Sequence, residues 1–457
     1  MSFANSGCSE QQSGHAGSVR RPSPSLLLLA GVLSPLLFAL YYVRRFGVNV
    51  PENDDWFFIP TLEAFYSGGS WFPLVLQHYT EHRIIIPKLL ILGFSQLTHF
   101  NAKSEMYLSV FLMGVCAFLV WQLIQLTTAP SWLIIPSGFL LLSPAQAENM
   151  LNGWQFCIPL CNTFCVGMVL LLAKRAVSWS RWIGAAACAT GATFSFAHGT
   201  LAWPIGLFLL IDRATMRKGQ ILIWIGTSAL MGVFYRWGYR GARDVPADYL
   251  SFWQHPAATA KLFLAILGSN FGSFQVVTSI AVGLVMLALV IVIVFLEPRL
   301  FHPQLRPWYA LLLFSLLASA LVSIGRSFAW EAFAQGTRYT TLSVFVPICS
   351  LAIAGLWFRL REPVYPRACI AAYAAIILIA SLLAVRTVRQ SWQLGQAVLQ
   401  DRLIARACLL DYRDASSDCL QRMFVYSGEL VRREAVVLEK YCLGPFYRRC
   451  RSADAPK

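Results

Sequence analysis

The feature that most constrains this chain is a series of long apolar runs that recurs from residue 25 to residue 385. A helix of about 20 mostly apolar residues crosses the roughly 30 Å of hydrocarbon in a bilayer. The alternating segments of about ten residues that are typical of a membrane β-barrel do not occur in the sequence. With 57% hydrophobic and 13% charged residues, the composition also lies outside that of soluble domains. The sequence therefore predicts an all-α fold, a multi-pass bundle of transmembrane helices.

Eleven of the apolar runs are predicted to span the membrane. Two remaining pieces, residues 131–143 with Pro136 and residues 257–273 with the interruption GSNFG, are predicted to enter the membrane without crossing it. Residues 84–143 hold three apolar pieces. Only two of them can cross, because the loops before and after this region, residues 44–83 and 144–155, are both predicted to lie outside. The predicted spans are residues 25–43, 84–100, 106–127, 156–173, 183–197, 200–211, 220–236, 276–296, 308–324, 342–358 and 369–385.

Positive charge in short loops predicts the orientation of the bundle, because Lys and Arg favour the cytoplasmic side. Residues 1–24, rich in Ser and Gly, are predicted to form a disordered tail on that side. Orientation accounts for the net charge of +15, which therefore does not indicate nucleic acid as a partner. Residues 44–83, 144–155, 237–256, 325–340 and the chain after 386 then face outward. The cytoplasmic loops are marked by Lys174, Arg175, Arg181, Arg213, Arg217, Lys218, Arg299, Arg306, Arg359, Arg361 and Arg367.

The chain divides into this tail, a transmembrane domain of residues 25–385 and a small outer segment of residues 386–457. A segment this small has a marginal core by itself, so we expect it to pack on the outer face of the membrane domain. An oxidising compartment would let its four cysteines pair, and short loops favour Cys408 with Cys419 and Cys442 with Cys450. Free thiols in a cytoplasmic tail are the alternative.

Unusual polar side chains gather in the loops predicted to face outward. Charged groups at membrane depth are costly and are usually retained for pairing or for a task, so this one-sided convergence predicts a pocket. Aromatic side chains of the first outer loop are typical either of an interfacial belt or of platforms for a sugar ring. The candidate residues are Asp54, Asp55, His78, Glu81, His82, Arg83, Glu148, Asn149, Trp154, Gln155, His198, Arg326, Arg338 and Tyr339.

The adjacent carboxylates of Asp54 and Asp55 are the candidate catalytic groups. Like charges side by side raise each other's proton affinity, which suits a general base for a hydroxyl group or a ligand of a divalent metal ion. The structural alternative is a helix N-cap, because Asn53 or Asp54 precedes the apolar sequence WFFIPTLEAFY.

The sequence HYTEHR, residues 78–83, allows two interpretations. On a helix, His78 and His82 would share one face and could bind zinc, although the pattern is not HExxH. The favoured interpretation is a hydrogen-bonded network in which Glu81 or Glu148 pairs with Arg83 at the mouth of the pocket.

Arg326 and Arg338 belong to the last loop between predicted spans. Two guanidinium groups that face one pocket suit bidentate binding of a phosphate. Anchoring to lipid headgroups is the alternative.

The chain resembles the GT-C membrane glycosyltransferases in four features. They are a long first outer loop with the acidic pair of NDDW, an aromatic stretch behind that pair, about eleven spans, and an outward C-terminal segment. That clan includes protein O-mannosyltransferases, lipid A aminoarabinose transferases and mycobacterial arabinosyltransferases. The resemblance covers residues 25 to about 385. It implies a polyprenyl-phosphate sugar as donor, and a glycan or lipid hydroxyl as acceptor.

By this resemblance, Asp54 or Asp55 would act as the base and Arg338, with Arg326, would hold the donor phosphate. Glu148 is the candidate for the second loop acid of the clan. The chain departs from many members in having an outer segment of only about 70 residues.

Two other functions fit a membrane bundle: a transporter or flippase of lipid-linked sugars, and a non-enzymatic assembly factor of the cell envelope. Transporters tend to bind near the midplane through broken helices, whereas these polar groups cluster in outer loops. No GxxxxGK[ST] sequence occurs, which argues against an ATP-driven pump. The expected location is a bacterial inner membrane.

Overall fold

The computed structural model describes residues 26–174, 177–211, 218–239, 251–272, 275–360, 367–424 and 427–453. This described part is all-helical and contains no strand, only an isolated bridge between Tyr79 and His82. Five of its helical stretches are long and apolar enough to cross a membrane. They are Ala102–Thr127, Gly153–Ala173, Val276–Leu296, Arg306–Ala334 and Thr337–Arg359. An all-α membrane protein, as the sequence predicts, is confirmed at this level.

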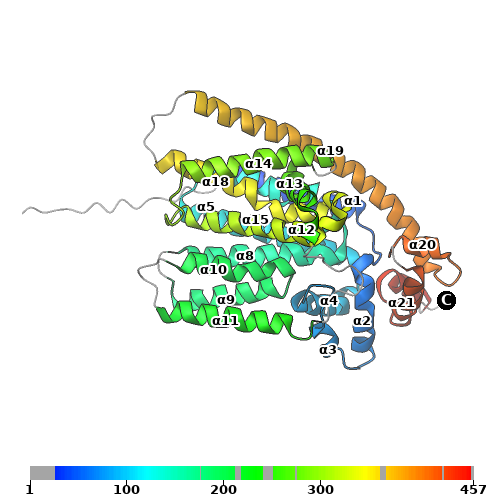
Figure 1. Cartoon of the computed structure of the whole chain (residues 1–457). Helices are drawn as coiled ribbons and strands as arrows, with labels where there is room; N and C mark the ends of the chain where they lie inside the picture. Colours follow the sequence, from blue (N-terminus) through cyan, green and yellow to red (C-terminus); the bar gives the residue numbers. More distant parts are fainter. Residues whose placement is uncertain are drawn as a thin grey trace, which may run out of the picture.

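Long helices run side by side along one common direction (Figure 1). Leu, Ile, Val, Ala and Trp side chains from most of them form a buried core that includes Trp182, Trp224 and Trp308. The buried side chains of α1 form a second, smaller core with α5 and part of α19. The helices are α1 (Leu26–Phe46), α5 (Ala102–Thr127), α8 (Cys157–Ala173), α9 (Trp179–Thr193), α10 (Ala202–Leu210), α11 (Lys218–Arg236), α14 (Val276–Leu296), α15 (Arg306–Arg326), α18 (Phe345–Leu360) and α19 (Arg367–Leu410).

One end of this bundle carries Arg side chains that join the ends of several helices, and we call it the basic end. Arg306, at the start of α15, donates to the carbonyls of Phe208 and Ile211 at the end of α10. Arg359 of α18 donates to the carbonyl of Thr128, directly after α5, at 2.5 Å. Arginines next to the last carbonyls of a helix satisfy acceptors that have no partner within the helix.

The opposite end is built from short helices, and we call it the cavity end. It contains η1 (Asn53–Phe58), α2 (Ile59–Tyr66), α3 (Phe72–Leu76), α16 (Trp330–Ala334) and η7 (Thr337–Tyr339). In Figure 1 the first two α-helices of this set lie across the right-hand end of the bundle, beside α4 (Ile85–Thr98).

Helix α4 begins and ends at the cavity end, so it does not traverse the bundle. At its start, the Ile86 amide donates to the carbonyl of Phe194 at the end of α9, at 3.1 Å. At its end, the His99 carbonyl accepts the Gly444 amide of the C-terminal segment at 2.7 Å. The sequence prediction of a span at residues 84–100 is therefore wrong. Its apolar side chains instead pack beneath the first loop, where Ile91 and Leu92 are buried.

Residues 130–151 take the place of that helix in the bundle. They leave the basic end beside Thr128 and reach the cavity end through α6 (Ile134–Leu141) and α7 (Ala147–Leu151). There the Asn149 amide group donates to the carbonyl of Arg338 at 2.9 Å. This piece, which the sequence predicts to enter without crossing, traverses the bundle as two short helices.

Helix α13 (Pro256–Gly272) continues through the sequence GSNFG, which therefore does not break the helix. Glycines allow α13 and α14 to pack backbone to backbone, since a Cβ atom on Gly268 would lie 1.9 Å from the Ser279 carbonyl oxygen. Helices α13 and α14 form a tight hairpin, and α13 also packs against α15 and α19.

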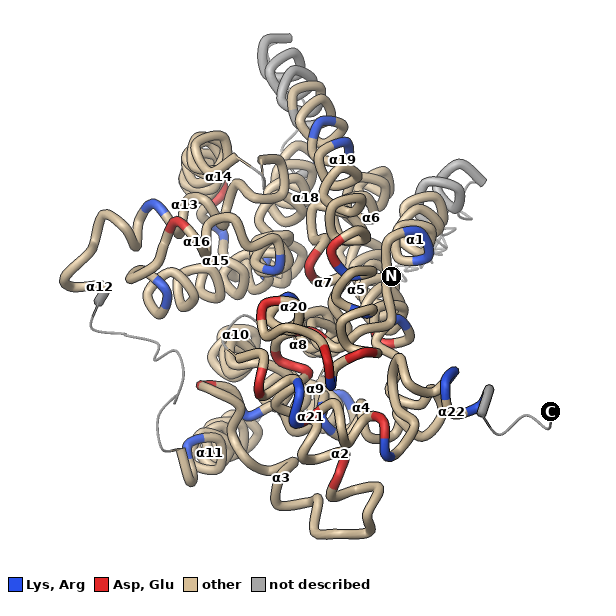
Figure 2. Tube along the Cα trace, turned by 90° about the vertical axis from the view of Figure 1, so that its right-hand side faces the viewer, with Lys and Arg blue, Asp and Glu red and all other residues tan. Residues whose placement is uncertain are grey.

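The C-terminal segment closes over the first loop. Helix α19 runs without interruption for 44 residues and carries the chain from the bundle into this segment (Figure 1). Disulfides join Cys408 to Cys419 and Cys442 to Cys450, the two pairings with short loops. The helices of the segment are α20 (Ser417–Gln421), α21 (Gly428–Lys440) and α22 (Tyr447–Ala453). Viewed toward the cavity end, α20 and α21 lie over the middle of the molecule (Figure 2).

Candidate functional site

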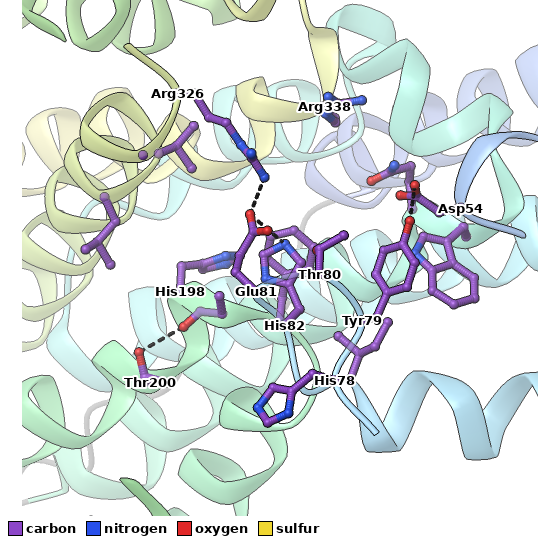
Figure 3. A pocket seen from close by; sticks show the side chains of 18 of the residues that line it. Asp54, His78, Tyr79, Thr80, Glu81, His82, His198, Thr200, Arg326 and Arg338 are labelled. Atoms are coloured by element: carbon purple, nitrogen blue, oxygen red, sulfur yellow. Dashed lines mark hydrogen bonds and ion pairs between the residues drawn. The ribbon is translucent and has the colours of Figure 1, made fainter. Parts of the chain in front are cut away.

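A cavity of about 790 Å³ lies at the cavity end, walled by parts of the chain that are far apart in sequence. The first loop, the turn before α8, the turn before α10, and the ends of α11 and α15 all contribute (Figure 3). Ten of the fourteen candidate residues line it: Asp54, His78, Glu81, His82, Trp154, Gln155, His198, Arg326, Arg338 and Tyr339.

The two adjacent carboxylates point to different places. Residues 53–58 form a 3₁₀ helix, in which the Glu52 amide donates to the Asp55 carboxylate at 2.8 Å. Asp55 thus caps this helix, is 1% exposed and does not line the cavity. Glu52 is the N-cap of this helix and Asp55 completes a capping box with it, so the interpretation with Asn53 or Asp54 as the N-cap is wrong. Asp54 is the member of the pair that reaches the cavity.

Burial is the main influence on Asp55. It raises the pKa of the carboxyl group to about 7, assisted by the nearby charges of Glu52 and Asp54 and opposed by the hydrogen bond from the Glu52 amide. Its Oδ1 atom has no hydrogen-bond partner among the described residues. Ionisation of Asp55 therefore lowers the stability of the folded protein.

Asp54 is held at the cavity wall by Tyr79, whose hydroxyl donates to Asp54 Oδ1 at 2.5 Å. The Tyr79 ring packs against Trp154 and Phe57, with centroids 5.4 Å and 5.6 Å away. Burial and the Asp54 charge raise the pKa of Tyr79, so the phenol stays protonated as a donor. A carboxylate with one fixed donor and one further oxygen is suited to accept a proton from a hydroxyl group.

Residues 77–84 form a turn instead of a helix, which rules out the arrangement assumed for zinc. Tyr79 and His82 exchange backbone hydrogen bonds of 2.7 Å, so the flanking side chains diverge. His78 turns to the carbonyl of Tyr235, at 2.7 Å, whereas His82 stacks on Phe196 with centroids 4.2 Å apart. In the described part of the chain no three His, Cys, Asp or Glu side chains are grouped to hold a metal ion.

The predicted pairing of Arg83 with Glu81 or Glu148 is wrong. The Arg83 guanidinium instead donates to the carbonyls of Phe234, at 2.6 Å, and Trp237, after the end of α11. Arg83 is 6% exposed and does not line the cavity. Its role is to tie the first loop to α11, because it satisfies carbonyls that have no partner within that helix.

Glu81 pairs with Arg326, which comes from the far end of α15. His82 Nε2 lies 3.5 Å from the same carboxylate oxygen. Burial raises the pKa of Glu81, but the His82 imidazolium, which is present at acidic pH, and the Arg326 guanidinium outweigh it and lower the pKa overall. Burial lowers the pKa of His82, against the attraction of Glu81. The ion pair is thus a carboxylate and a guanidinium beside a neutral imidazole.

Four atoms in this part of the cavity wall are buried and have no hydrogen-bond partner among the described residues. They are Oε2 of Glu81, Nδ1 of His82, Nδ1 of His198 and Nη1 of Arg326. His198 is 3% exposed, and its other ring nitrogen lies 3.4 Å from Asn162 Oδ1. Buried polar atoms are almost always paired, so four together indicate a place for a polar ligand.

Arg338 lies on another part of the wall, apart from the Glu81–Arg326 pair (Figure 3). Its guanidinium lies 3.4 Å from the Tyr339 hydroxyl, and its backbone amide donates to the Glu148 carboxylate at 2.8 Å. Glu148 does not line the main cavity. It lines an adjoining cavity of about 310 Å³, which shares Arg338 and Gln155 with the first. Asn149 is fully buried and lines neither.

The sequence did not reveal several residues that build this site. Tyr79, Phe196, Tyr239 and Phe333 line the cavity without having been candidates. Phe424 comes from the C-terminal segment and contacts Phe57 edge to face at 5.2 Å. Tyr79 lies inside HYTEHR, so its place next to His78 was a signal that could have identified it. No sequence pattern connects Phe424 with the first loop.

Models of known protein families, curated proteins and solved structures were compared with this chain, and none matches it.

Proposed function

We propose that this protein is a GT-C-like membrane glycosyltransferase that moves a sugar from a polyprenyl-phosphate donor to a hydroxyl group of an extracytoplasmic glycan or lipid. The observation that carries the proposal is one cavity of about 790 Å³ whose wall holds the Asp54 carboxylate and the Arg338 guanidinium. A base and a cation in one cavity are what this transfer needs, since a hydroxyl proton must leave and a phosphate must be stabilised.

In the proposed reaction Asp54 accepts the proton of the acceptor hydroxyl. The oxygen attacks the anomeric carbon of the donor sugar, and the bond from that carbon to the phosphate oxygen breaks. The polyprenyl phosphate leaves with its negative charge beside Arg338. Tyr79 orients Asp54 through the 2.5 Å hydrogen bond. Asp55 has no part in the chemistry, because it caps the 3₁₀ helix and does not line the cavity.

The proposal includes eleven membrane crossings, formed by α1, α5, residues 130–151, α8, α9, α10, α11, α14, α15, α18 and the first part of α19. Five of the corresponding stretches have the length and apolar composition of a span by themselves. With the basic end in the cytoplasm, the cavity and both disulfides lie outside, in an oxidising compartment. A bacterial inner membrane is the proposed location.

The test begins with a deletion strain whose surface glycans are compared with the parent by mass spectrometry, which identifies the missing sugar and its acceptor. Complementation then uses the wild type, Asp54→Asn, Asp55→Asn and Glu439→Gln. Glu439 is the matched control, a carboxylate that pairs with an arginine and a tyrosine but lies in the C-terminal segment.

We expect Asp54→Asn to lower transfer at least about 100-fold, the contribution of a general base, with unchanged expression. Asp55→Asn and Glu439→Gln should retain transfer. Full transfer by Asp54→Asn, or an unchanged glycan profile in the deletion strain, would contradict the proposal.

A further inference from the structure

The four side chains Glu81, His82, His198 and Arg326, which we call the Glu81 cluster, are not used by the proposed reaction. We propose that this cluster is a subsite for an uncharged, hydroxyl-rich sugar ring and that it excludes rings with a carboxylate, such as uronic acids. The inference rests on the proposed function for the identity of the ligand as a sugar. It adds which class of sugar enters the cavity.

The cluster contains buried hydrogen-bonding atoms that the described residues leave without a partner. Glu81 Oε2 is an acceptor and Arg326 Nη1 is a donor, and both are buried without a partner. His82 Nδ1 and His198 Nδ1 are also without a partner, and a neutral imidazole offers either role. A hydroxyl group both donates and accepts, so several hydroxyls of one ring satisfy such a mixed set. A phosphate only accepts hydrogen bonds and leaves Glu81 unsatisfied.

The charges within the cluster balance each other. Glu81 and Arg326 pair with each other, so the cluster offers an entering ligand no net positive charge. The lowered pKa of Glu81 keeps its carboxylate ionised, and the lowered pKa of His82 keeps its imidazole neutral. A carboxylated ring would meet the Glu81 carboxylate, and Arg326, the one cation of the cluster, is already paired with that carboxylate. Repulsion between two carboxylates costs more in a desolvated site than in water. Neutral rings carry no such cost.

Aromatic rings provide an apolar surface beside the cluster. The Phe196 ring, with its stacked His82, lies 5.3 Å from the His198 ring between centroids. Phe333 lies under the Arg326 guanidinium at 5.4 Å. Sugar rings present C–H groups on one face and hydroxyls around the edge, so aromatic faces with polar groups around them match that chemistry.

The ring could belong to the donor or to the acceptor, and one experiment decides both the proposal and the source. The purified full-length protein in detergent is examined by saturation-transfer difference NMR with neutral methyl glycosides of glucose and mannose and with methyl glucuronoside. We expect saturation transfer to at least one neutral glycoside and none to the glucuronoside. Undecaprenyl-phosphate glucose is then added. Displacement of the neutral glycoside assigns the subsite to the donor ring, and persistence assigns it to the acceptor ring.

Variants connect the signal to the cluster. His198→Gln and Arg326→Lys should weaken binding of the neutral glycoside at least 10-fold, while Glu81→Gln should admit the glucuronoside. Glu439→Gln, an ion-pair partner far from the cavity, should bind as the wild type does. Each variant is accepted only if it elutes as a single species in size-exclusion chromatography. If Glu81→Gln does not fold, Arg326→Lys still tests the cluster, because it keeps the positive charge beside Glu81.

Binding of the glucuronoside to the wild type as strongly as the neutral glycosides, no binding of any glycoside, or unchanged binding in His198→Gln and Arg326→Lys would each overturn the proposal. Asp54→Asn separates this result from the proposed function, because it should bind the ring and fail to transfer it. A wild type that binds the ring in the cluster but transfers no sugar would leave the subsite in place and refute the glycosyltransferase.

Discussion

Asp54 and Asp55 show how strongly the environment of a single residue decides its role. Their side chains leave the same 3₁₀ helix in different directions, one to the cavity and one into the core of the cavity end. A buried carboxyl group with a raised pKa stabilises the fold only while it is protonated. The pair therefore divides into a candidate base and a buried group whose ionisation opposes folding.

We predict that Asp55→Asn stabilises the protein above neutral pH. The unfolded carboxyl ionises near 3.8 and the folded one near 7, so wild-type stability falls as pH rises through this interval and then levels off. The shift corresponds to a penalty on the order of 4 kcal/mol. Asn can still accept the Glu52 amide and does not ionise. Thermal unfolding of the detergent-solubilised variants at pH 4.5, 6 and 8 measures the difference.

The control for this prediction is Asp401→Asn, at an exposed carboxylate paired with Arg422. It should leave the pH dependence of unfolding unchanged, because exposed pairs contribute little. A constant difference between Asp55→Asn and wild type from pH 4.5 to 8 would show that Asp55 is not a buried acid.

At this scale the sequence located the polar residues but not their partners. Ten of the fourteen candidate residues line the cavity, because membrane proteins rarely retain such groups without a use. The pairings were wrong where they depended on side-chain direction. HYTEHR forms a turn, so Arg83 goes to α11 and Glu81 to Arg326. Such a turn has no regular periodicity, so the directions of its side chains cannot be derived from the sequence.

At the scale of elements, the C-terminal segment acts as a strap on the first loop. Arg402 of α19 pairs with Glu52, and the Asn53 amide donates to the Met423 carbonyl at 2.7 Å. These contacts flank η1 and hold Asp54 in place. Sequence reasoning placed this segment on the same side as the first loop but had no means to predict contacts between residues more than 300 positions apart.

We predict that removing the Cys408–Cys419 disulfide loosens this strap. Closing a loop of this length restricts the unfolded chain and contributes about 3 kcal/mol. The double variant Cys408→Ser with Cys419→Ser should therefore show faster amide hydrogen exchange in α20 and in η1. Cys116→Ser, at a buried free cysteine of α5, is the control and should leave exchange at both elements unchanged. Unchanged exchange in the double variant would show that the strap does not depend on the disulfide.

The α13–α14 hairpin gives a second prediction at this scale. Gly268→Ala would place a methyl group 1.9 Å from the Ser279 carbonyl oxygen, which belongs to the backbone of α14 and cannot move aside cheaply. Overpacking of this kind costs about 3 kcal/mol, so we expect a clearly lower thermal midpoint.

Gly226→Ala in α11 is the matched control, since no atom lies within 4 Å of its added Cβ. It should be neutral or slightly stabilising, because Ala has the higher helix propensity. Equal thermal midpoints for both variants would contradict the close contact of α13 with α14.

For the whole molecule, composition and loop charge were enough to predict a helical membrane protein with its polar candidates at one end. They were not enough to assign each apolar piece. Residues 84–98 and 131–141 have similar hydrophobicity, and only their tertiary contacts separate them. The first piece receives the Gly444 amide at its far end, whereas the second connects Pro130 at the basic end with Asn149 at the cavity end. Exchanging these two pieces leaves the proposed number of crossings at eleven.

This exchange makes a prediction about sidedness that differs from the one based on the sequence. A span at residues 84–100 would place residue 101 in the cytoplasm and residue 129 outside. The fold places Asn101 beside Asn49 at the cavity end, where Asn49 Oδ1 accepts the Ala102 amide at 3.0 Å. Thr128 lies at the basic end, where its carbonyl accepts Arg359. With the cavity facing outward, residue 101 is therefore outside and residue 129 is cytoplasmic.

Single cysteines at Asn101 and Thr128, in a variant without the other free cysteines, test this arrangement in intact cells with a membrane-impermeant maleimide. We expect Asn101→Cys to be labelled and Thr128→Cys to be protected until the membrane is permeabilised. A cysteine at Gly68, in the first loop, marks the outer side, and one at Arg299 marks the cytoplasmic side. Protection at residue 101 together with labelling at residue 128 would restore the sequence-based topology. It would also require α4 to leave the cavity end and so break the hydrogen bond from the Gly444 amide to the His99 carbonyl.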